Sequence, residues 1–179
     1  MNAKSALRAA LFGTFALSSG CAGSMGGGGG GYNVPQSRGE FVAAIEAGMG
    51  PTTVVAFRAD RDLDTLSALL EERSEACLRK TVRYPPPDMF STWSSTTFNP
   101  TVERKGDATE FTLQKINKPE GVGAQVPPGG LYDMAANVYT APDGGIEVRI
   151  YRATMGRQRV PDAVEAWLRG SSTDCPRLR

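Results

Sequence analysis

The sequence predicts an α+β fold in which an antiparallel sheet packs helices on one face. Three observations carry this prediction. A helix, a strand and a second helix are indicated first, several strands follow, and a third helix comes last. Two turn signals divide the strand-rich part into hairpins, and apolar residues alternate with polar ones along it. Strands joined by short turns pair antiparallel, and helices then cover a face of the sheet as a second layer.

The first half of the chain contributes two helices and two strands. Residues Ser37 to Gly48 begin with a capping-box pattern and end at a glycine, which predicts a short helix. Thr52 to Phe57 is rich in β-branched residues and predicts a strand. Asp62 is placed to cap the strongest helical pattern, which runs from Leu63 to Cys77. Lys80 to Tyr84 predicts a strand that ends at three prolines, because proline cannot continue a hydrogen-bonded ladder.

The second half is expected to hold two hairpins and a final helix. Thr101 to Arg104 and Thr109 to Ile116 flank a Lys-Gly-Asp turn. Leu131 to Thr140 and Ile146 to Arg152 flank a Pro-Asp-Gly-Gly turn, and the last of these segments alternates strictly between apolar and polar residues. Val160 to Gly170 has proline in its first turn, apolar residues on one side and glycine at its end, which predicts a helix.

The charge of the chain excludes several classes of function. Its 179 residues include 20 Lys and Arg, 19 Asp and Glu, and no His. A net charge of +1 leaves no basic footprint for nucleic acid, so no nucleic-acid partner is expected. Without His, Ser-His-Asp and Cys-His catalysis and His-ligated zinc are excluded. We therefore predict no catalytic residue and no cofactor; an exported hydrolase that uses carboxylates is the enzymatic alternative.

The nearest approach to a metal motif lies at the start of the second helix. Asp60, Asp62, Asp64 and Glu71 occupy positions 1, 3, 5 and 12 of a calcium-loop template. Thr65 stands where that loop requires glycine, and the residues after it already follow helical spacing. We interpret these acids as side chains favoured at a helix N-terminus by the helix dipole, and predict no metal site.

Residues 1 to 20 have the order of a secretory signal peptide. Lys4 and Arg8 give a basic start, Ala9 to Leu17 is mostly apolar, and small residues follow. The apolar stretch is about half of the ~20 residues that a membrane-spanning helix needs. We therefore expect this segment to be removed during export.

The end of the signal, Leu17-Ser18-Ser19-Gly20-Cys21, resembles the lipobox of bacterial lipoproteins. Ser18 stands three places before the cysteine, where the usual pattern has leucine. The resemblance implies cleavage before Cys21, acylation of Cys21 and anchoring in the lipid bilayer. Ala22 follows, where the family's inner-membrane retention signal has Asp, which implies the periplasmic face of the outer membrane. The alternative is ordinary secretion with a chance cysteine beside the cleavage site.

A glycine-rich tether is expected between the anchor and the folded domain. Residues 21 to 36 contain six consecutive glycines, which lose much entropy on ordering and therefore favour a flexible chain. Residues 37 to 179 then form a single domain. If Cys21 is acylated, Cys77 and Cys175 remain as a pair in an oxidising compartment, and we predict a disulfide between them. The alternative is that Cys77 is a small buried residue of its helix.

The element order from Thr52 to Gly170 is similar to a helix-grip sandwich, and to the domains of the accessory lipoprotein of the outer-membrane β-barrel assembly machinery. This resemblance implies that the last helix lies across the sheet. It also implies that the helices carrying or preceding Cys77 and Cys175 share one sheet face, which fits the predicted disulfide.

An aromatic and proline-rich segment is the candidate partner-binding region. Its aromatic and large apolar residues are Tyr84, Met89, Phe90, Trp93 and Phe98. Exposed aromatic side chains suit a contact surface, because they supply a large contact area at little entropy cost. The alternative is a long loop folded over the sheet that buries these rings in the core.

These observations predict a non-enzymatic envelope lipoprotein, a membrane-tethered module that binds or assembles with another envelope protein. The alternative function is a carrier of a small apolar ligand, held between the sheet and the last helix. An apolar cavity above ~300 Å³ would favour the carrier, and a filled core beneath exposed aromatics would favour the binding module.

Overall fold

The computed structural model describes residues 34–85, 93–119, 126–154 and 158–178. The signal peptide, Cys21 and most of the predicted tether lie outside the described residues, as do Met89 and Phe90 of the predicted binding segment.

A six-stranded antiparallel sheet forms the centre of the fold, with strand order β1-β6-β5-β4-β3-β2. The strands are β1 (Thr52–Ala59), β2 (Lys80–Tyr84), β3 (Ser94–Lys105), β4 (Ala108–Lys118), β5 (Leu131–Thr140) and β6 (Ile146–Ala153). The helices are α1 (Arg38–Glu46), α2 (Leu63–Arg73), which continues as a π-helical turn (Ser74–Leu78), and α3 (Arg159–Arg169). The predicted α+β class and antiparallel pairing are confirmed.

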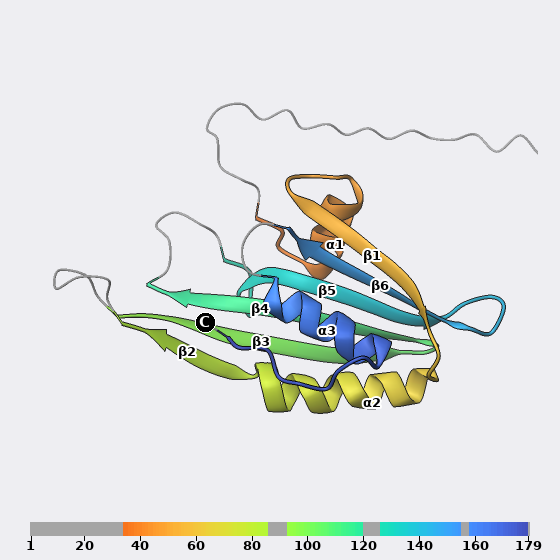
Figure 1. The fold of residues 1–179 in the computed structure, drawn as a ribbon. Coiled ribbons are helices and arrows are strands. Elements are labelled where there is room, and N and C mark those ends of the chain that lie inside the picture. Colours follow the sequence, from red (N-terminus) through yellow and green to blue (C-terminus); the bar gives the residue numbers. More distant parts are fainter. Residues whose placement is uncertain (1–33, 86–92, 120–125, 155–157, 179) are drawn as a thin grey trace, which may run out of the picture. The chain divides into compact units, whose positions relative to one another are not determined.

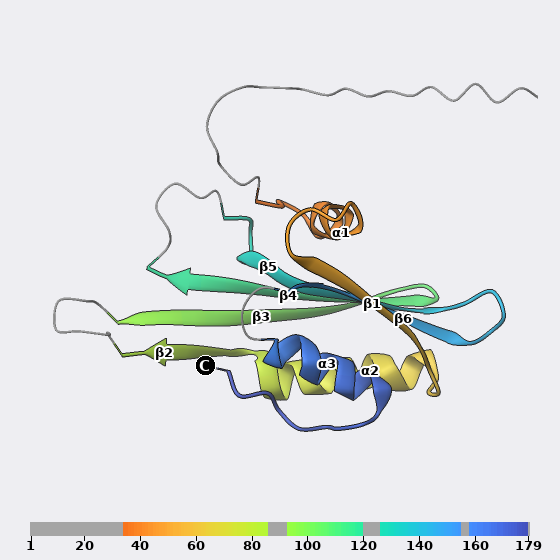
Figure 2. The same cartoon turned by 45° about the horizontal axis from the view of Figure 1, so that its top comes forward.

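Helices α2 and α3 cover one face of the sheet, as predicted (Figures 1 and 2). Apolar residues at alternate strand positions point toward these helices and form the main core with them. Its fully buried large side chains include Leu66, Leu70, Phe111, Ile150, Val164 and Trp167. Gly170 ends α3 in the left-handed conformation, with φ of 72°, as the glycine stop in the sequence predicts.

Helix α1 packs against the opposite face of the sheet (Figure 2). Phe41 and Ile45 contact Ala135 and Tyr151, whose strand neighbours Ala136 and Ile150 belong to the main core on the other side. Because successive strand residues point to opposite faces, this small cluster lies across the sheet from α2 and α3. The prediction of helices on one face therefore describes α2 and α3, and α1 adds a partial third layer.

Strand β3 begins at Ser94, seven positions before the strand that the sequence predicts at Thr101. Because of Pro100, the sequence predicts a strand only after this residue, since proline lacks the amide N–H that a central strand needs. In the structure β2 pairs with β3 only from Ser94 to Phe98, so Pro100 has no strand beside it on that side. Its carbonyl accepts a hydrogen bond from Arg79 Nη2 at 2.7 Å instead.

The predicted disulfide joins Cys77 to Cys175, with 1.94 Å between the sulfurs and 5.1 Å between the Cα atoms. Cys77 lies in the π-helical turn after α2 and is fully buried, and Cys175 lies in the tail after α3. Trp167 Nε1 also donates a hydrogen bond to the carbonyl of Asp174 in this tail at 2.9 Å. Residues Asp174 and Cys175 are therefore held beside α2 and α3.

Candidate functional site

The structure separates the predicted aromatic segment into three environments. Trp93 stands just before β3 and is 65% exposed, whereas Phe98 is 6% exposed and belongs to the main core. Tyr84 ends β2 and is half-buried. The expectation of a loop that reaches Phe98 is therefore corrected: Ser94 to Phe98 is strand, because it pairs with β2 and, from Ser95 onward, also with β4.

Tyr84 and Phe98 line a groove of about 310 Å³ on the helix-covered face, which we call the tail groove. Its floor comes from residues of three neighbouring strands. The register places Thr96 opposite Asn117 and Phe98 opposite Lys115, so all of these side chains share one face. The floor residues are Tyr84, Thr96, Phe98, Lys115 and Asn117, and the walls are Arg159 and Val160 of α3 with Arg177 and Leu178 of the tail.

The charges in the tail groove are unequally compensated. Lys115 Nζ pairs with Asp133 at 2.5 Å and lies 5.5 Å from the centre of the Phe98 ring. Arg159 and Arg177 are both exposed, and within the described part of the chain neither guanidinium has a hydrogen-bond or ion-pair partner. Counting only the residues that the structure describes, the groove therefore carries two positive charges without a partner, over an aromatic floor.

A second hollow lies around Trp93 at the same end of the sheet, and we call it the Trp93 hollow. It measures about 300 Å³ and is lined by Arg83, Trp93, Ser94 and Ser95. Arg83 and Lys118 are the two register partners of Ser95, so both flank it on the face opposite Phe98. Among the described residues neither cation has a charge partner. An exposed indole beside unpaired cations suits contact with another molecule.

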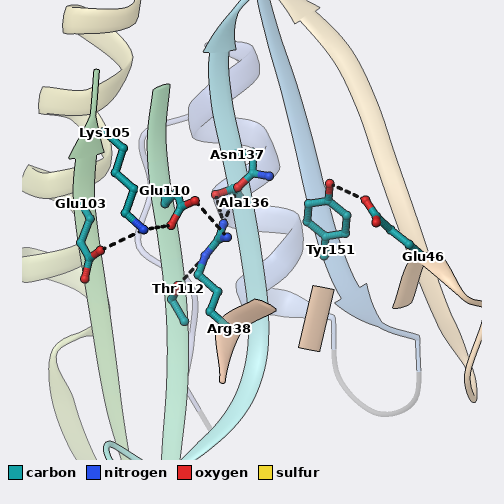
Figure 3. A network of polar contacts seen from close by, with 9 residues as sticks. All are labelled: Arg38, Glu46, Glu103, Lys105, Glu110, Thr112, Ala136, Asn137 and Tyr151. Atoms are coloured by element: carbon teal, nitrogen blue, oxygen red, sulfur yellow. Dashed lines mark hydrogen bonds and ion pairs between the residues drawn. The ribbon is translucent and has the colours of Figure 1, made fainter. Parts of the chain in front are cut away.

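A third, polar cleft of about 420 Å³ lies beside α1 (Figure 3). Its charged groups pair with one another. Lys105 Nζ lies 2.7 Å from Glu110 and 3.5 Å from Glu103, and Arg38 Nη1 lies 3.4 Å from Glu110. The two cations and two carboxylates compensate, so this cleft offers a ligand less unpaired charge than the tail groove.

Arg38 fastens α1 to the sheet within this network (Figure 3). Its Nε donates to Thr112 Oγ1 at 3.0 Å, and its Nη2 donates to the carbonyl of Ala136 at 3.0 Å and to Asn137 Oδ1. The side chain is only 20% exposed. These contacts give Arg38 a structural role, because they use most of the donors of its guanidinium.

Tyr151 and Glu46 form the other polar contact of α1 (Figure 3). The Tyr151 hydroxyl donates to Glu46 Oε1 at 3.1 Å. Burial and this hydrogen bond raise the pKa of Tyr151 above its ordinary value. Tyr151 therefore stays protonated over a wide pH range and holds the far end of α1 to β6.

Two acids of the calcium-loop template, Asp62 and Asp64, make contacts within the fold. Asp62 caps α2, because its carboxylate accepts from Thr65 N at 2.7 Å and from Thr65 Oγ1 at 2.8 Å. These bonds lower the pKa of Asp62. Asp64 pairs with Arg104. The described ranges hold no group of three or more His, Cys, Asp or Glu side chains placed to bind a metal ion.

The sequence pattern did not single out the two arginines of the tail groove. Arg159 stands at the start of the predicted last helix, and Arg177 stands two residues after Cys175. The predicted disulfide is the signal that could have found Arg177, because it brings the tail to the helices. The register of β2, β3 and β4, which sets the floor of the groove, has no comparable sequence signal.

Comparison with protein-family models, with curated proteins and with solved structures finds no match to this chain. Where the structure describes helices, none combines the length and the apolar character that crossing a membrane requires.

Proposed function

We propose that this protein is a non-enzymatic, membrane-tethered binding domain of the bacterial envelope, and that it contacts a protein partner through the Trp93 hollow. The lipobox-like end of the signal at Cys21 supports the tether and the periplasmic face of the outer membrane as its location. The glycine-rich residues 21 to 36 support a domain that moves freely beside the membrane.

The exposure of Trp93 is the observation that carries the proposal. Trp93 is 65% exposed just before the start of β3, whereas Trp167, the other tryptophan, is fully buried. Tryptophan and arginine are the residues most enriched among those that dominate binding energy at protein interfaces. Arg83 lines the same hollow, and Lys118 flanks it through Ser95. This charge favours a partner whose contact surface is acidic.

The alternative function, a carrier of an apolar ligand, requires space between the sheet and α3. In that layer Val164, Trp167 and Leu168 are buried and pack with strand residues into one core. The space along these residues is filled. The tail groove stays open at the start of α3, but charged and polar side chains line much of it, so it is not the apolar cavity that such a carrier requires. This favours the binding domain over the apolar carrier.

Affinity capture from crosslinked cells tests the proposal, with the wild-type protein compared with a Trp93→Ala, Arg83→Gln variant. Both side chains are exposed, so the variant is expected to fold and to lose the captured partner. An Arg159→Gln, Arg177→Gln variant serves as the matched control and should retain it. An unchanged set of partners in the Trp93 variant would remove the hollow from the proposal.

Membrane fractionation tests the tether separately. Cys21→Ala should release the protein from membranes into the soluble periplasmic fraction, because the acylated thioether is lost. Membrane association that persists in high salt would contradict acylation at Cys21. The Trp93 variant, with Cys21 intact, should stay in the membrane fraction, and its release would contradict anchoring through Cys21.

A further inference from the structure

We infer that the tail groove binds a small molecule that carries an oxyanion, a phosphate or a carboxylate, on an aromatic or apolar group. This site lies on the face of the sheet opposite the Trp93 hollow and does not depend on the proposed protein partner. Three features of the groove lead to this chemistry.

The first feature is the pair of arginines on its walls. Arg159 begins α3 and Arg177 lies in the tail, so the two guanidinium groups enter the groove from separate elements. Neither has a partner among the described residues. A guanidinium presents a planar fork of donors that matches the oxygens of a carboxylate or phosphate, and such charge-assisted pairs are stronger than neutral hydrogen bonds.

The second feature is the apolar surface between these charges. Phe98 forms the floor and is buried beneath Lys115, Val160 is buried in the wall, and Tyr84 and Leu178 are half-buried. Because Phe98 and Val160 are already buried, the apolar surface that a bound ion alone would leave in water is mainly that of Tyr84 and Leu178. A ring attached to the oxyanion would contact it, and about 310 Å³ lies at the lower end of the ~300–1,000 Å³ range of small-molecule sites.

The third feature is that the groove is formed before a ligand arrives. The disulfide between Cys77 and Cys175 fixes the tail two residues before Arg177, and Leu178 packs against the main core. Lys115 is held by Asp133 and by the Phe98 ring. A site held in place in this way loses less conformational entropy on binding than a mobile one.

The contrast with the cleft beside α1 supports the assignment. That cleft is larger, at about 420 Å³, but Arg38 and Lys105 are already paired with Glu110. An anion entering it would have to displace a carboxylate of the protein. In the tail groove Asp133 pairs with Lys115, and no acid of the described ranges pairs with either arginine, which leaves both for a ligand.

Calorimetric titration of the purified full chain tests the site, with phenyl phosphate, benzoate, inorganic phosphate and phenol as probes. Phenyl phosphate or benzoate should bind about tenfold or more tightly than either inorganic phosphate or phenol, because only these two probes combine both groups. Whichever of phenyl phosphate and benzoate binds more tightly shows whether the groove prefers a phosphate or a carboxylate. If phenol binds as tightly as phenyl phosphate or benzoate, the role of the arginines is overturned. If neither phenyl phosphate nor benzoate binds, the site itself is overturned.

Two double variants with the same loss of charge make the assignment specific. Arg159→Gln, Arg177→Gln should weaken the better probe about tenfold or more, whereas Arg83→Gln, Lys118→Gln should leave its affinity within about twofold. Arg159→Lys, Arg177→Lys should restore part of the affinity, because the charge returns without the fork. Equal weakening in both Gln variants would show a general charge effect and overturn the proposal. Loss of the captured partner in the Trp93 variant has no bearing on this result.

Discussion

Arg38 shows how one side chain fixes the position of a helix. It stands in the capping-box pattern at the start of α1, where the sequence suggests only a helix boundary. Its guanidinium reaches Thr112 of β4 and the Ala136 carbonyl of β5. Because the residue is only 20% exposed, losing it would leave these acceptors without their donor in a partly buried place.

We expect Arg38→Gln to lower the free energy of unfolding by about 1–3 kcal/mol, because unsatisfied buried acceptors cost about that much. Denaturant unfolding measures the loss, and hydrogen exchange should show faster opening of α1 than of α2. Arg58→Gln is the control, since Arg58 forms an exposed ion pair with Asp143 whose side chains are 63% and 55% exposed. The two variants should differ clearly; equal stability would contradict the structural role of Arg38.

At the scale of the element, Asp62 governs the start of α2. Its pKa is lowered by hydrogen bonds from Thr65, so the folded state favours the ionised carboxylate. A group whose pKa is lower in the folded state stabilises the fold above its unfolded pKa of about 3.9. That contribution is lost as the pH falls from about 4 through the folded-state pKa.

Asp62→Asn should therefore flatten the acid side of the stability profile, because asparagine keeps the capping oxygen but does not titrate. Unfolding free energies measured between about pH 2 and pH 7 should fall less steeply below about pH 4 in the variant than in the wild type. Acid profiles of the same slope would show that Asp62 carries no pH-dependent stability. Near pH 7 the variant should retain the helix.

The disulfide also acts between elements, because it joins the turn after α2 to the tail after α3. Its cysteines are 98 positions apart in the chain. Removing a crosslink over a loop of this size is expected to cost about 2–4 kcal/mol in stability. It should also loosen Arg177, and so weaken binding in the tail groove.

Cys77→Ser, Cys175→Ser in a Cys21→Ala background tests this expectation. Denaturant unfolding should show the lower stability, and titration with phenyl phosphate or benzoate should show weaker binding. Maleimide labelling of the Cys21→Ala protein is the control, and it should find no free thiol before reduction. Two free thiols under those conditions would contradict the disulfide.

At the scale of the whole molecule, the order of elements follows from local patterns. The hairpin of β5 and β6 was predictable because strict alternation and a Pro-Asp-Gly-Gly turn specify it. The face that α1 covers was not predictable, because Phe41 and Ile45 can pack on either side of a sheet. Pro100 concealed the first half of β3. A proline is acceptable there because β2 begins at Lys80, opposite Phe98, and so leaves Pro100 without a neighbour on that side.

The candidate sites depend on strand register and on the packing of distant segments, which local sequence patterns do not specify. The sequence nominated Tyr84, Trp93 and Phe98 together, whereas the fold places Trp93 in one hollow and the other two in another. Strand alternation causes this division, because it sends neighbouring residues to opposite faces. Arg159 and Arg177 meet only through the packing of α3 and the path of the tail.

Site-specific photocrosslinking in living cells tests whether Trp93 lies at a surface that binds a protein partner. A photoreactive aromatic amino acid, which keeps a large aromatic ring at the site, replaces Trp93, and in a second strain it replaces Met49, which is 63% exposed between α1 and β1. We expect a discrete protein adduct from position 93 and none from position 49. The same adducts from both positions, or none from position 93, would contradict a binding surface at Trp93.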